Sequence, residues 1–317
     1  MTMTSYLEFE KPIAALDARI AELRETADTG EIDIDSEIER LAAKSRKLLA
    51  STYAGLTPWQ KTLVARHPAR PHFKHYVAGM FDEFLPLAGD RAFGDDKAIM
   101  GGFARMGEQR LVVIGHEKGD TTESRIRHNF GMGKPEGYRK AIRLMDLADR
   151  FGLPVVTLVD TSGAFPGVQA EERGQAEAIA RSTERCLSLG VPMVSAIVGE
   201  GGSGGAVALA SAERVLMFEH AVYSVISPEG CASILWRTAD RAADAAEAMQ
   251  VTAADLKRLN VIDRIVKEPV GGAHRDSAQA IQELAKAVRE ELETLKKLSP
   301  LELRAAREAR FLAIGAL

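Results

Sequence analysis

The sequence predicts an α/β fold whose strands pair mainly in parallel. Two observations lead to this prediction. From residue 97 onward, short apolar strand-like segments alternate with longer amphipathic helical segments, and this alternation is typical of parallel sheets covered by helices. The chain also has 317 residues, which is long enough for one large domain with a sizeable buried core.

The first part of the chain shows helical rather than strand periodicity. Apolar residues recur at spacings of three and four in two stretches, which predicts two helices. These positions are Ile13, Leu16, Ile20 and Leu23, followed by Ile34, Ile38, Leu41 and Leu48. We expect a helical hairpin with its turn near Gly30 and with Asp35 or Ser36 as the cap of the second helix. Residues 57–90 also read as helical.

The central region carries the alternation. Residues 98–117 read as two strands joined at Gly107-Glu108. The further expected elements are helices at 135–151 and 170–189 and strands at 154–160, 191–198, 213–218 and 222–226. A helix over 227–236 should begin with Ser227 as its N-cap and Pro228 at its first position.

The C-terminal region predicts a long helix that starts at Ser277. Its apolar stripe consists of Ile281, Leu284, Val288, Leu292 and Leu295. We therefore divide the chain into an N-terminal helical region (1–88), a core (89–275) and a C-terminal helical segment (276–317).

Composition narrows the class of protein. The net charge is −4 with both signs spread along the chain, which argues against a dominant nucleic-acid surface. Two cysteines, Cys186 and Cys231, supply neither a disulfide framework nor a four-ligand zinc site, so we expect no metal in this chain. No apolar run reaches the roughly 20 residues of a membrane span, and the start lacks a signal-peptide pattern. We expect a cytoplasmic protein.

The segment GEGGSGGA, residues 199–206, matches two known motifs. Gly199, Gly201 and Gly204 fit the dinucleotide fingerprint G-x-G-x-x-G. The room for a helix before Arg214 is only about two turns, whereas a dinucleotide-binding unit needs a full-length helix.

The second match, G-x-S-x-G centred on Ser203, fits a nucleophile elbow. It would need an acid and a histidine later in the chain, for which Asp263 and His274 are available by order alone. This alternative stays open.

A third interpretation concerns backbone N–H groups. A glycine-rich strand-to-helix junction exposes amide donors and the positive end of the helix dipole to an approaching group. We expect Gly204, Gly205 and Ala206 to donate to an oxyanion here. Close packing of helix and strand is the simpler explanation for Gly201 or Gly202.

Four long segments, taken together, resemble a known family. They are RHNFGMGKPEGYRKAIRLM (127–145), DTSGAFPGVQAEERGQAEAIA (160–180), GEGGSGGA (199–206) and YSVISPEGCASILW (223–236). The chain is similar to the carboxyltransferase alpha subunit of bacterial multi-subunit acetyl-CoA carboxylase over roughly nine-tenths of its length. The resemblance implies a crotonase-like (ClpP/crotonase) spiral of β-β-α units with helical extensions at both ends. In the loop where the family usually has Asp-Thr-Pro-Gly-Ala-Tyr, Ser162 and Phe165 replace proline and tyrosine.

The resemblance also implies an activity and a set of partners. With a zinc-containing beta subunit, the chain would transfer the carboxyl group of carboxybiotin to acetyl-CoA and form malonyl-CoA for fatty acid biosynthesis. The biotin is attached to the biotin carboxyl carrier protein and serves as a substrate. ATP would be used by the biotin carboxylase component, since no P-loop is present in this chain. An α2β2 assembly is expected.

The resemblance also implies which residues of this sequence form the biotin site. Gly204 and Gly205 would stabilise the ureido oxyanion of biotin, and the glycine segment would adjoin the biotin pocket. The expected pocket residues are Gly163, Ala164, Phe165, Gly167, Gly201, Gly202, Gly230 and Cys231. Cys231 is expected to be buried rather than reactive. A basic cluster would meet CoA phosphates or the carrier, or would form a solvated surface: Arg125, Arg127, His128, Lys134, Arg139 and Lys140.

Two functions from other classes remain open at this point. One is a self-sufficient crotonase-type acyl-CoA hydratase or hydrolase, for which Glu200 is the carboxylate closest to the glycine segment. The other is a scaffold that keeps the fold and the partner interface without turnover. The intact glycine segment argues against a scaffold, which has no use for exposed amide donors.

Overall fold

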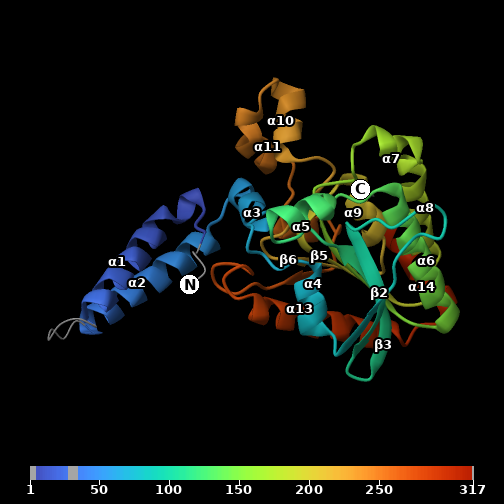
Figure 1. Ribbon diagram of the computed structural model, residues 1–317, viewed down its shortest axis with the longest axis horizontal. Coiled ribbons are helices and arrows are strands. Elements are labelled where there is room, and N and C mark those ends of the chain that lie inside the picture. The colour runs from blue at the N-terminus through green and yellow to red at the C-terminus, as the bar shows by residue number, and fades with distance from the viewer. Residues whose placement is uncertain (1–4, 28–34, 316–317) are drawn as a thin grey trace.

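The computed structural model describes residues 5–27 and 35–315. In this part of the chain, eight strands form one mixed sheet with the order β1-β2-β3-β4-β5-β6-β8, and β7 pairs with β5 beside this path. Figure 1 shows the sheet at the centre, a helical pair extending at the N-terminal end and a second helical pair standing above.

The sheet is antiparallel at one end and parallel elsewhere. β1 (Glu83–Pro86), β2 (Ile99–Met106) and β3 (Gln109–His116) form an antiparallel ribbon. The remaining strands pair in parallel, which confirms the predicted predominance. They are β4 (Val155–Thr161), β5 (Met193–Gly202), β6 (Arg214–Phe218), β7 (Val222–Ser224) and β8 (Arg264–Val266).

Helices cover both faces of the sheet, and two glycines show which helix lies on which face. A Cβ atom on Gly101 of β2 would lie 2.7 Å from Leu144 in α6, whereas one on Gly115 of β3 would lie 2.5 Å from Phe73 in α4. Gly101 faces Ile114, the neighbour of Gly115, and successive residues of a strand point to opposite faces. Thus α6 (Pro135–Phe151) and α4 (Phe73–Met80) lie on opposite faces.

The remaining helices extend these two layers. α8 (Gln175–Ser188) and α9 (Ser203–Ala210) pack beside α6, and α13 (Ser277–Leu295) packs on α4. α3 (Pro58–Ala65) precedes α4, α7 (Val168–Glu172) precedes α8, and α5 (Thr122–Arg127) follows β3. α12 (Ala253–Arg258) precedes β8, and α14 (Pro300–Ala313) ends the described chain.

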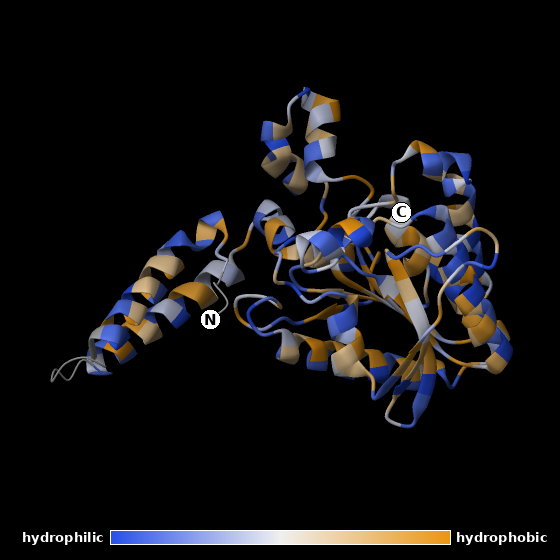
Figure 2. Ribbon diagram, in the orientation of Figure 1, coloured by the Kyte–Doolittle hydropathy of each residue, from blue (hydrophilic) through white to orange (hydrophobic). Residues whose placement is uncertain are grey.

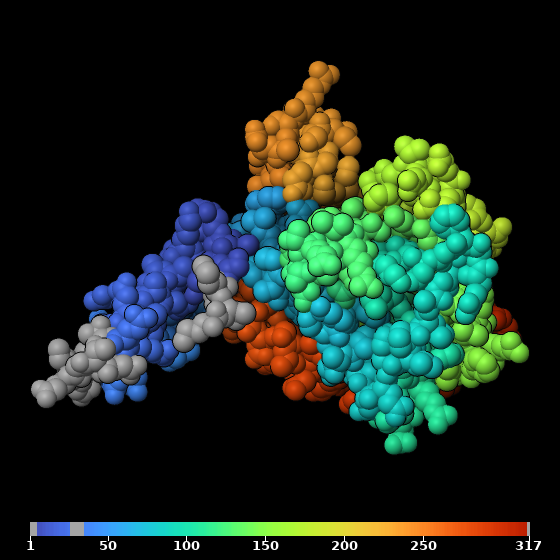
Figure 3. Space-filling view, viewed as in Figure 1, coloured from blue at the N-terminus to red at the C-terminus, as the bar shows by residue number. Residues whose placement is uncertain are grey.

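Two helical pairs project from this body. α1 (Lys11–Ala27) and α2 (Asp35–Ala54) form the expected N-terminal hairpin; the expected turn at Gly30, and Ile34, lie outside the described residues. α10 (Pro228–Trp236) and α11 (Ala242–Ala248) form a flap, which is the orange lobe that projects above the rest of the molecule in Figure 3. In α10, Ser227 accepts a hydrogen bond from the Gly230 N–H and Pro228 takes the first position, as predicted.

Several predicted elements differ from the structure. Residues 83–86, expected to be helical, form an edge strand because they complete the ladder of β2. The helix expected over 170–189 is two helices, since Gly174 adopts a left-handed φ of 77° between them. The strand expected at 222–226 ends at Ser224. At the C-terminus, the predicted long helix is confirmed as α13, and α14 follows it as a second helix.

The described part of the chain has one large hydrophobic core. Apolar side chains of β3, β4 and β5 are almost fully buried between the two helical layers. Figure 2 shows the hydrophobic residues gathered along these central elements and the hydrophilic ones on the outer helices. Within residues 5–27 and 35–315, every helix is too short or too polar to span a bilayer.

Candidate active site

The glycine junction, which we define as residues 199–206, connects the end of β5 to the start of α9. β5 extends through Gly202, and α9 begins at Ser203 with a φ of 51°, a left-handed value that is uncommon outside glycine. The first N–H groups of an α-helix have no acceptor inside the helix. Gly202 is the N-cap residue and has no side chain with which to cap them. The junction therefore presents amide donors at the positive end of the α9 dipole.

The four glycines at 201, 202, 204 and 205 are there for different reasons. A Cβ on Gly201 would lie 2.7 Å from the Tyr223 ring, and one on Gly202 would lie 2.3 Å from the Ser162 carbonyl. A Cβ on Gly205 would lie 2.8 Å from the carbonyl carbon of Gly163. Close packing therefore explains why positions 201, 202 and 205 are glycines.

Gly204 is different from its neighbours. The nearest atom to a Cβ at this position would be a methyl group of Ile179, at 3.3 Å. Gly204 is half-buried, whereas Gly205 and Ala206 are buried directly behind it. The backbone of Gly204 is thus the most accessible part of the expected donor group.

An apolar pocket of about 430 Å³ opens beside the junction. Its lining comes from α9, from β7 with the residue that follows it, and from the segment between α11 and β8. The lining residues are Ser203, Gly204, Val207, Tyr223, Ser224, Val225, Met249, Leu256 and Val261. Burial raises the pKa of Tyr223 to about 12, so its phenol stays protonated over the neutral pH range. Groups that titrate near pH 7 are absent from this lining.

The loop after β4 packs against the junction. Thr161 Oγ1 donates to the Gly163 carbonyl at 2.7 Å and accepts from the Gly163 N–H at 3.1 Å, which closes a tight turn. The Gly163 backbone then contacts Gly205. Of the residues expected to wall a biotin pocket, the structure therefore brings Gly163 and Ala164 to the junction.

The other expected pocket residues lie farther along this loop or in the flap. Phe165 is half-buried, with Lys134 Nζ 5.0 Å from its ring centre, and Gly167 is the N-cap of α7. Gly230 belongs to the capped first turn of α10, where Cys231 is half-buried rather than buried as expected. The flap projects into solvent, which leaves Cys231 incompletely covered.

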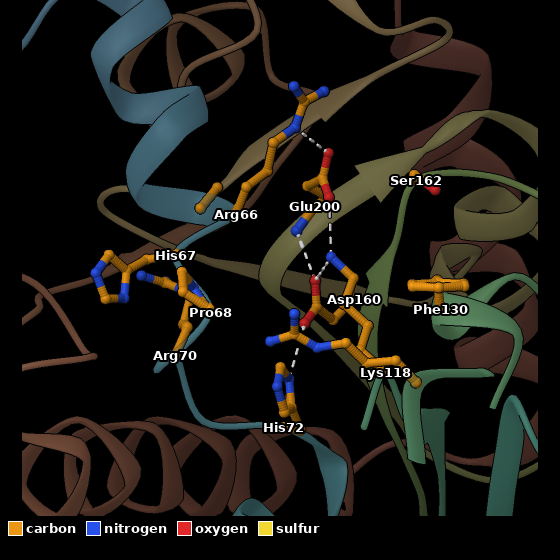
Figure 4. A pocket seen from close by; sticks show the side chains of 12 residues that line it. Arg66, His67, Pro68, Arg70, His72, Lys118, Phe130, Asp160, Ser162 and Glu200 are labelled. Atoms are coloured by element: carbon orange, nitrogen blue, oxygen red, sulfur yellow. Dashed lines mark hydrogen bonds and ion pairs between the residues drawn. The ribbon is translucent and has the colours of Figure 1, made fainter. Parts of the chain in front are cut away.

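A second hollow, which we call the ion-pair cavity, lies at the carboxyl ends of β3, β4 and β5 (Figure 4) and has a volume of about 280 Å³. Its lining includes the buried side chains of Arg70, Asp160 and Glu200. The lining residues are Ala65, Arg66, His67, Pro68, Arg70, His72, Lys118, Arg125, Phe130, Asp160, Ser162 and Glu200. Ser162, one of the two residues that depart from the family loop, thus faces this cavity rather than the apolar pocket.

Glu200 is fixed by two cations in the ion-pair cavity. Its carboxylate lies 2.8 Å from Lys118 Nζ and 2.6 Å from Arg66 Nε. Burial raises the pKa of Glu200, but Lys118 and Arg66 outweigh this effect and the net shift is downward. A carboxylate held ionised in this way is a poor general acid, and it lines a different hollow from Gly204. The geometry does not support the self-sufficient hydratase alternative.

The serine-nucleophile alternative also lacks its partners. The ring of His274 stacks on His67 with centroids 3.9 Å apart, and burial holds its pKa near 3. Asp263 pairs with Arg310 at 3.0 Å and accepts the Val215 N–H. In the described part of the chain, these groups are committed elsewhere and form no triad with Ser203.

The expected basic cluster includes residues held by structural contacts, among them Arg125, whose Nε donates to the Gly119 carbonyl at 3.3 Å, and the exposed Arg127. Lys140 is buried and pairs with Asp95 at 2.6 Å, and Arg139 pairs with the buried Asp90 at 2.9 Å. Arg125 is half-buried at the ion-pair cavity, and Arg127 is exposed.

Sequence reasoning missed Lys118 and Arg66. Lys118 follows a predicted strand by one residue, and the carboxyl ends of parallel strands are where sites form. That position was the available signal for Lys118. Arg66 lies at the end of α3 and gave no local signal.

The mixed sheet with its two helical layers has a crotonase-like fold. Among solved structures, a Pseudomonas malonate decarboxylase hetero-tetramer in complex with coenzyme A matches 75% of this chain and 95% of its own, with a TM-score of 0.58 and 18% identity. A transcarboxylase 12S core matches 68% of this chain at a TM-score of 0.55 and 20% identity, and the match spans 42% of that longer chain. These likenesses confirm the crotonase-like fold.

Sequence comparison gives the family. The model for "acetyl co-enzyme A carboxylase carboxyltransferase-like" proteins matches residues 6–315. The acetyl-coenzyme A carboxylase carboxyl transferase subunit alpha of Rhizorhabdus wittichii is 74% identical over 99% of this chain and all of its own, and that of Erythrobacter litoralis is 72% identical over the same shares. The chain belongs to this family. Within this family, it is a carboxyl transferase subunit of the alpha type.

Proposed function

We propose that this chain provides the biotin-side half of the carboxyltransferase site, with the N–H groups of Gly204 and Gly205 as donors to the ureido oxygen. The observation that carries the proposal is the uncapped N-terminus of α9 beside the apolar pocket. Gly205 and Ala206 are both buried behind Gly204, and we propose the N–H of Ala206 as a third donor.

The chemistry matches what these donors offer. Negative charge develops on the ureido oxygen as the carboxyl group leaves carboxybiotin, and preorganised N–H groups at this point lower the barrier. The freed ureido nitrogen then takes the α-proton of acetyl-CoA, and the resulting enolate attacks the released carbon dioxide to form malonyl-CoA. This chain therefore need not supply a side-chain base. The absence of a titrating group near pH 7 from the described pocket lining agrees with this assignment.

The partners follow from the family. We propose that a zinc-containing beta subunit holds the acetyl-CoA enolate opposite Gly204, that the biotin carboxyl carrier protein delivers the substrate, and that biotin carboxylase consumes the ATP. We propose an α2β2 assembly that acts in the cytoplasm. In the described residues, no group of acidic, histidine and cysteine side chains is arranged to hold a metal ion.

The apolar lining suits the bicyclic ring of biotin. Val207 and Val225 are exposed in the isolated chain, Val225 by 79%, and we propose that they contact the incoming biotin or the partner subunit. The loop residues Gly163, Ala164, Phe165 and Gly167 and the junction residues Gly201 and Gly202 would form the wall behind the ring. Gly230 and Cys231 would approach only if the flap closes over the pocket.

For CoA or the carrier, we propose contacts at Arg125, Arg127 and Lys134. The malonate decarboxylase relative is described in complex with coenzyme A, which supports a CoA site in this fold. Arg139, which we expected to contribute, has its guanidinium bound to Asp90 and to the Arg173 carbonyl, and is better assigned to holding α6.

The test is decarboxylation of malonyl-CoA with biocytin as acceptor, which is the transfer run backwards. It should be measured for this chain, for a beta subunit and for their equimolar mixture. We expect turnover only in the mixture, because each chain would hold one half of the site. Equal turnover by this chain alone would contradict the proposal.

A further inference from the structure

The end of β5 contains a bulge that overlaps the start of the glycine junction. β4 and β5 pair regularly up to Val159 and Ile197, and pairing resumes between Thr161 and Gly201. Asp160 therefore lies alone on β4 opposite three residues of β5, 198–200. A bulge leaves backbone groups without their ladder partners and changes the direction of the strand.

Side chains replace the missing ladder partners of this bulge. The Glu200 N–H donates to Asp160 Oδ1 at 2.9 Å, and Arg70 Nε donates to the Val198 carbonyl at 2.7 Å. Between them, a Cβ on Gly199 would lie 2.4 Å from Asp160 Oδ1. The Asp160 carboxylate thus lies directly over the bulge, and Gly199 leaves the space for it.

Buried charges hold the Asp160 carboxylate in this position. Lys118 Nζ lies 2.8 Å from Asp160 Oδ1 and 2.8 Å from Glu200 Oε2 (Figure 4). Burial alone would lower the pKa of Lys118, but the two carboxylates outweigh it and the shift is upward. The Arg70 guanidinium is fixed in turn by Glu268 at 2.7 Å.

We infer that Asp160 is a positioning residue that holds the bulge at 198–200 and thereby sets the direction of the Gly204 and Gly205 N–H groups. The expected effect on catalysis rests on the proposed function. The contact between Asp160 and the Glu200 N–H does not depend on that proposal. Only two residues separate Glu200 from Ser203, whose left-handed φ starts α9. A change in the direction of β5 at Glu200 should therefore reorient the N–H groups of Gly204 and Gly205.

The test compares Asp160→Ala with Asp160→Asn in the assembled carboxyltransferase. Asparagine keeps an oxygen that accepts from the Glu200 N–H and from Lys118, whereas alanine removes it. We expect Asp160→Ala to lower kcat about tenfold to a hundredfold, since a misplacement of about 1 Å at a site can cost roughly 10²-fold. KM should change less than about twofold, because substrate contacts remain. Asp160→Asn should restore most of kcat.

Two further measurements separate positioning from general stability. Glu213→Gln weakens a buried pair with Arg307 at the amino ends of β5 and β6, away from the bulge. This variant should lower the melting temperature without lowering kcat. Gly199→Ala should reproduce the Asp160→Ala effect, because its methyl group displaces the carboxylate. Gly94→Ala, where a Cβ meets open space, is the matched control.

Backbone hydrogen exchange over residues 196–206 tests whether Asp160 stabilises the bulge, and it does so without relying on turnover. Faster exchange in Asp160→Ala, but not in Asp160→Asn, is the expected result. Unchanged exchange, or an unchanged kcat with faster exchange, would overturn the positioning role. Failure of the wild-type mixture to transfer a carboxyl group would instead count against the proposed function, and the exchange result would still decide whether Asp160 holds the bulge.

Discussion

Two hollows adjoin the glycine junction, and their linings differ in kind. The apolar pocket is lined by valine, leucine, methionine, tyrosine and serine side chains, with Gly204 at its wall. The ion-pair cavity is lined by four arginine or lysine side chains, two histidines and two carboxylates, with Glu200 at its wall. Residues only four positions apart in one strand-to-helix connection thus face opposite environments.

The difference indicates a division of roles. In the ion-pair cavity, charged side chains form short ion pairs such as those of Lys118 with Asp160 and Glu200. Charged groups held in this way position the backbone of the glycine junction. On the apolar side, the backbone itself carries the chemistry through N–H groups, which are strongest as donors where water and competing charges are excluded. The following predictions test this division, beginning with the largest effect.

The first prediction concerns Gly204→Val, a substitution in the wall of the apolar pocket. The valine side chain would lie against Ile179 and crowd the Gly204 N–H at the edge of the pocket. We expect kcat to fall by about 10²-fold or more, comparable to the loss of one oxyanion-hole donor, with a small change in melting temperature. Gly94→Val, in open space, serves as the control. Wild-type turnover by Gly204→Val would show that the donors lie elsewhere.

Acid should act on the ionic side first. Burial lowers the pKa of His116 to about 4 and that of His274 to about 3. The unfolded chain therefore takes up more protons than the folded one below the usual histidine pKa of about 6.5, so stability present above that pH is lost as the pH falls toward 4. Asp96, whose pKa burial raises to about 6, opposes part of this loss.

Carboxylates extend the same trend to lower pH. The pKa of Glu268 would be raised by burial but is lowered to about 2 by Arg70, and its contribution is lost below the ordinary glutamate range. We expect the free energy of unfolding, measured by urea titration between about pH 7 and pH 4, to fall by several kcal/mol, at about 1.4 kcal/mol per pKa unit. His116→Gln should flatten the first part of this dependence. A pH-independent stability would contradict it.

Ser203→Ala should have the smallest effect. The account gives the Ser203 hydroxyl no covalent role, so we expect kcat within about threefold of wild type, whereas loss of a nucleophile costs orders of magnitude. Ser203→Gly is the matched variant, because glycine accepts the φ of 51° without strain. A drop of several orders of magnitude in both variants would revive the nucleophile-elbow interpretation.

Local patterns in the sequence predicted much of this arrangement. The Ser227 cap, the stripe of α13 and the short helix after Gly205 all depend on neighbours within one or two turns. Those are the distances over which periodicity and capping operate.

Features that depend on distant partners were not predicted. β1 is a four-residue edge strand, too short for a period of its own, and β2 defines it. Gly199 looked like part of a dinucleotide fingerprint, yet its space is needed by Asp160, 39 positions earlier. Lys118 and Arg66 meet Glu200 across 82 and 134 positions. Only the folded sheet brings these residues to one edge.

The most direct test of the division is the pH dependence of turnover in Glu200→Gln, assembled with the beta subunit. This variant leaves Lys118 paired with Asp160 and Arg66 paired with Glu229, so each remaining cation keeps a carboxylate. The account predicts a kcat no more than about tenfold below wild type, with a pH profile of the same shape as that of the wild type. A loss of more than about 10³-fold, or a changed shape of the pH profile, would make Glu200 an acid or base and contradict a site built from backbone donors.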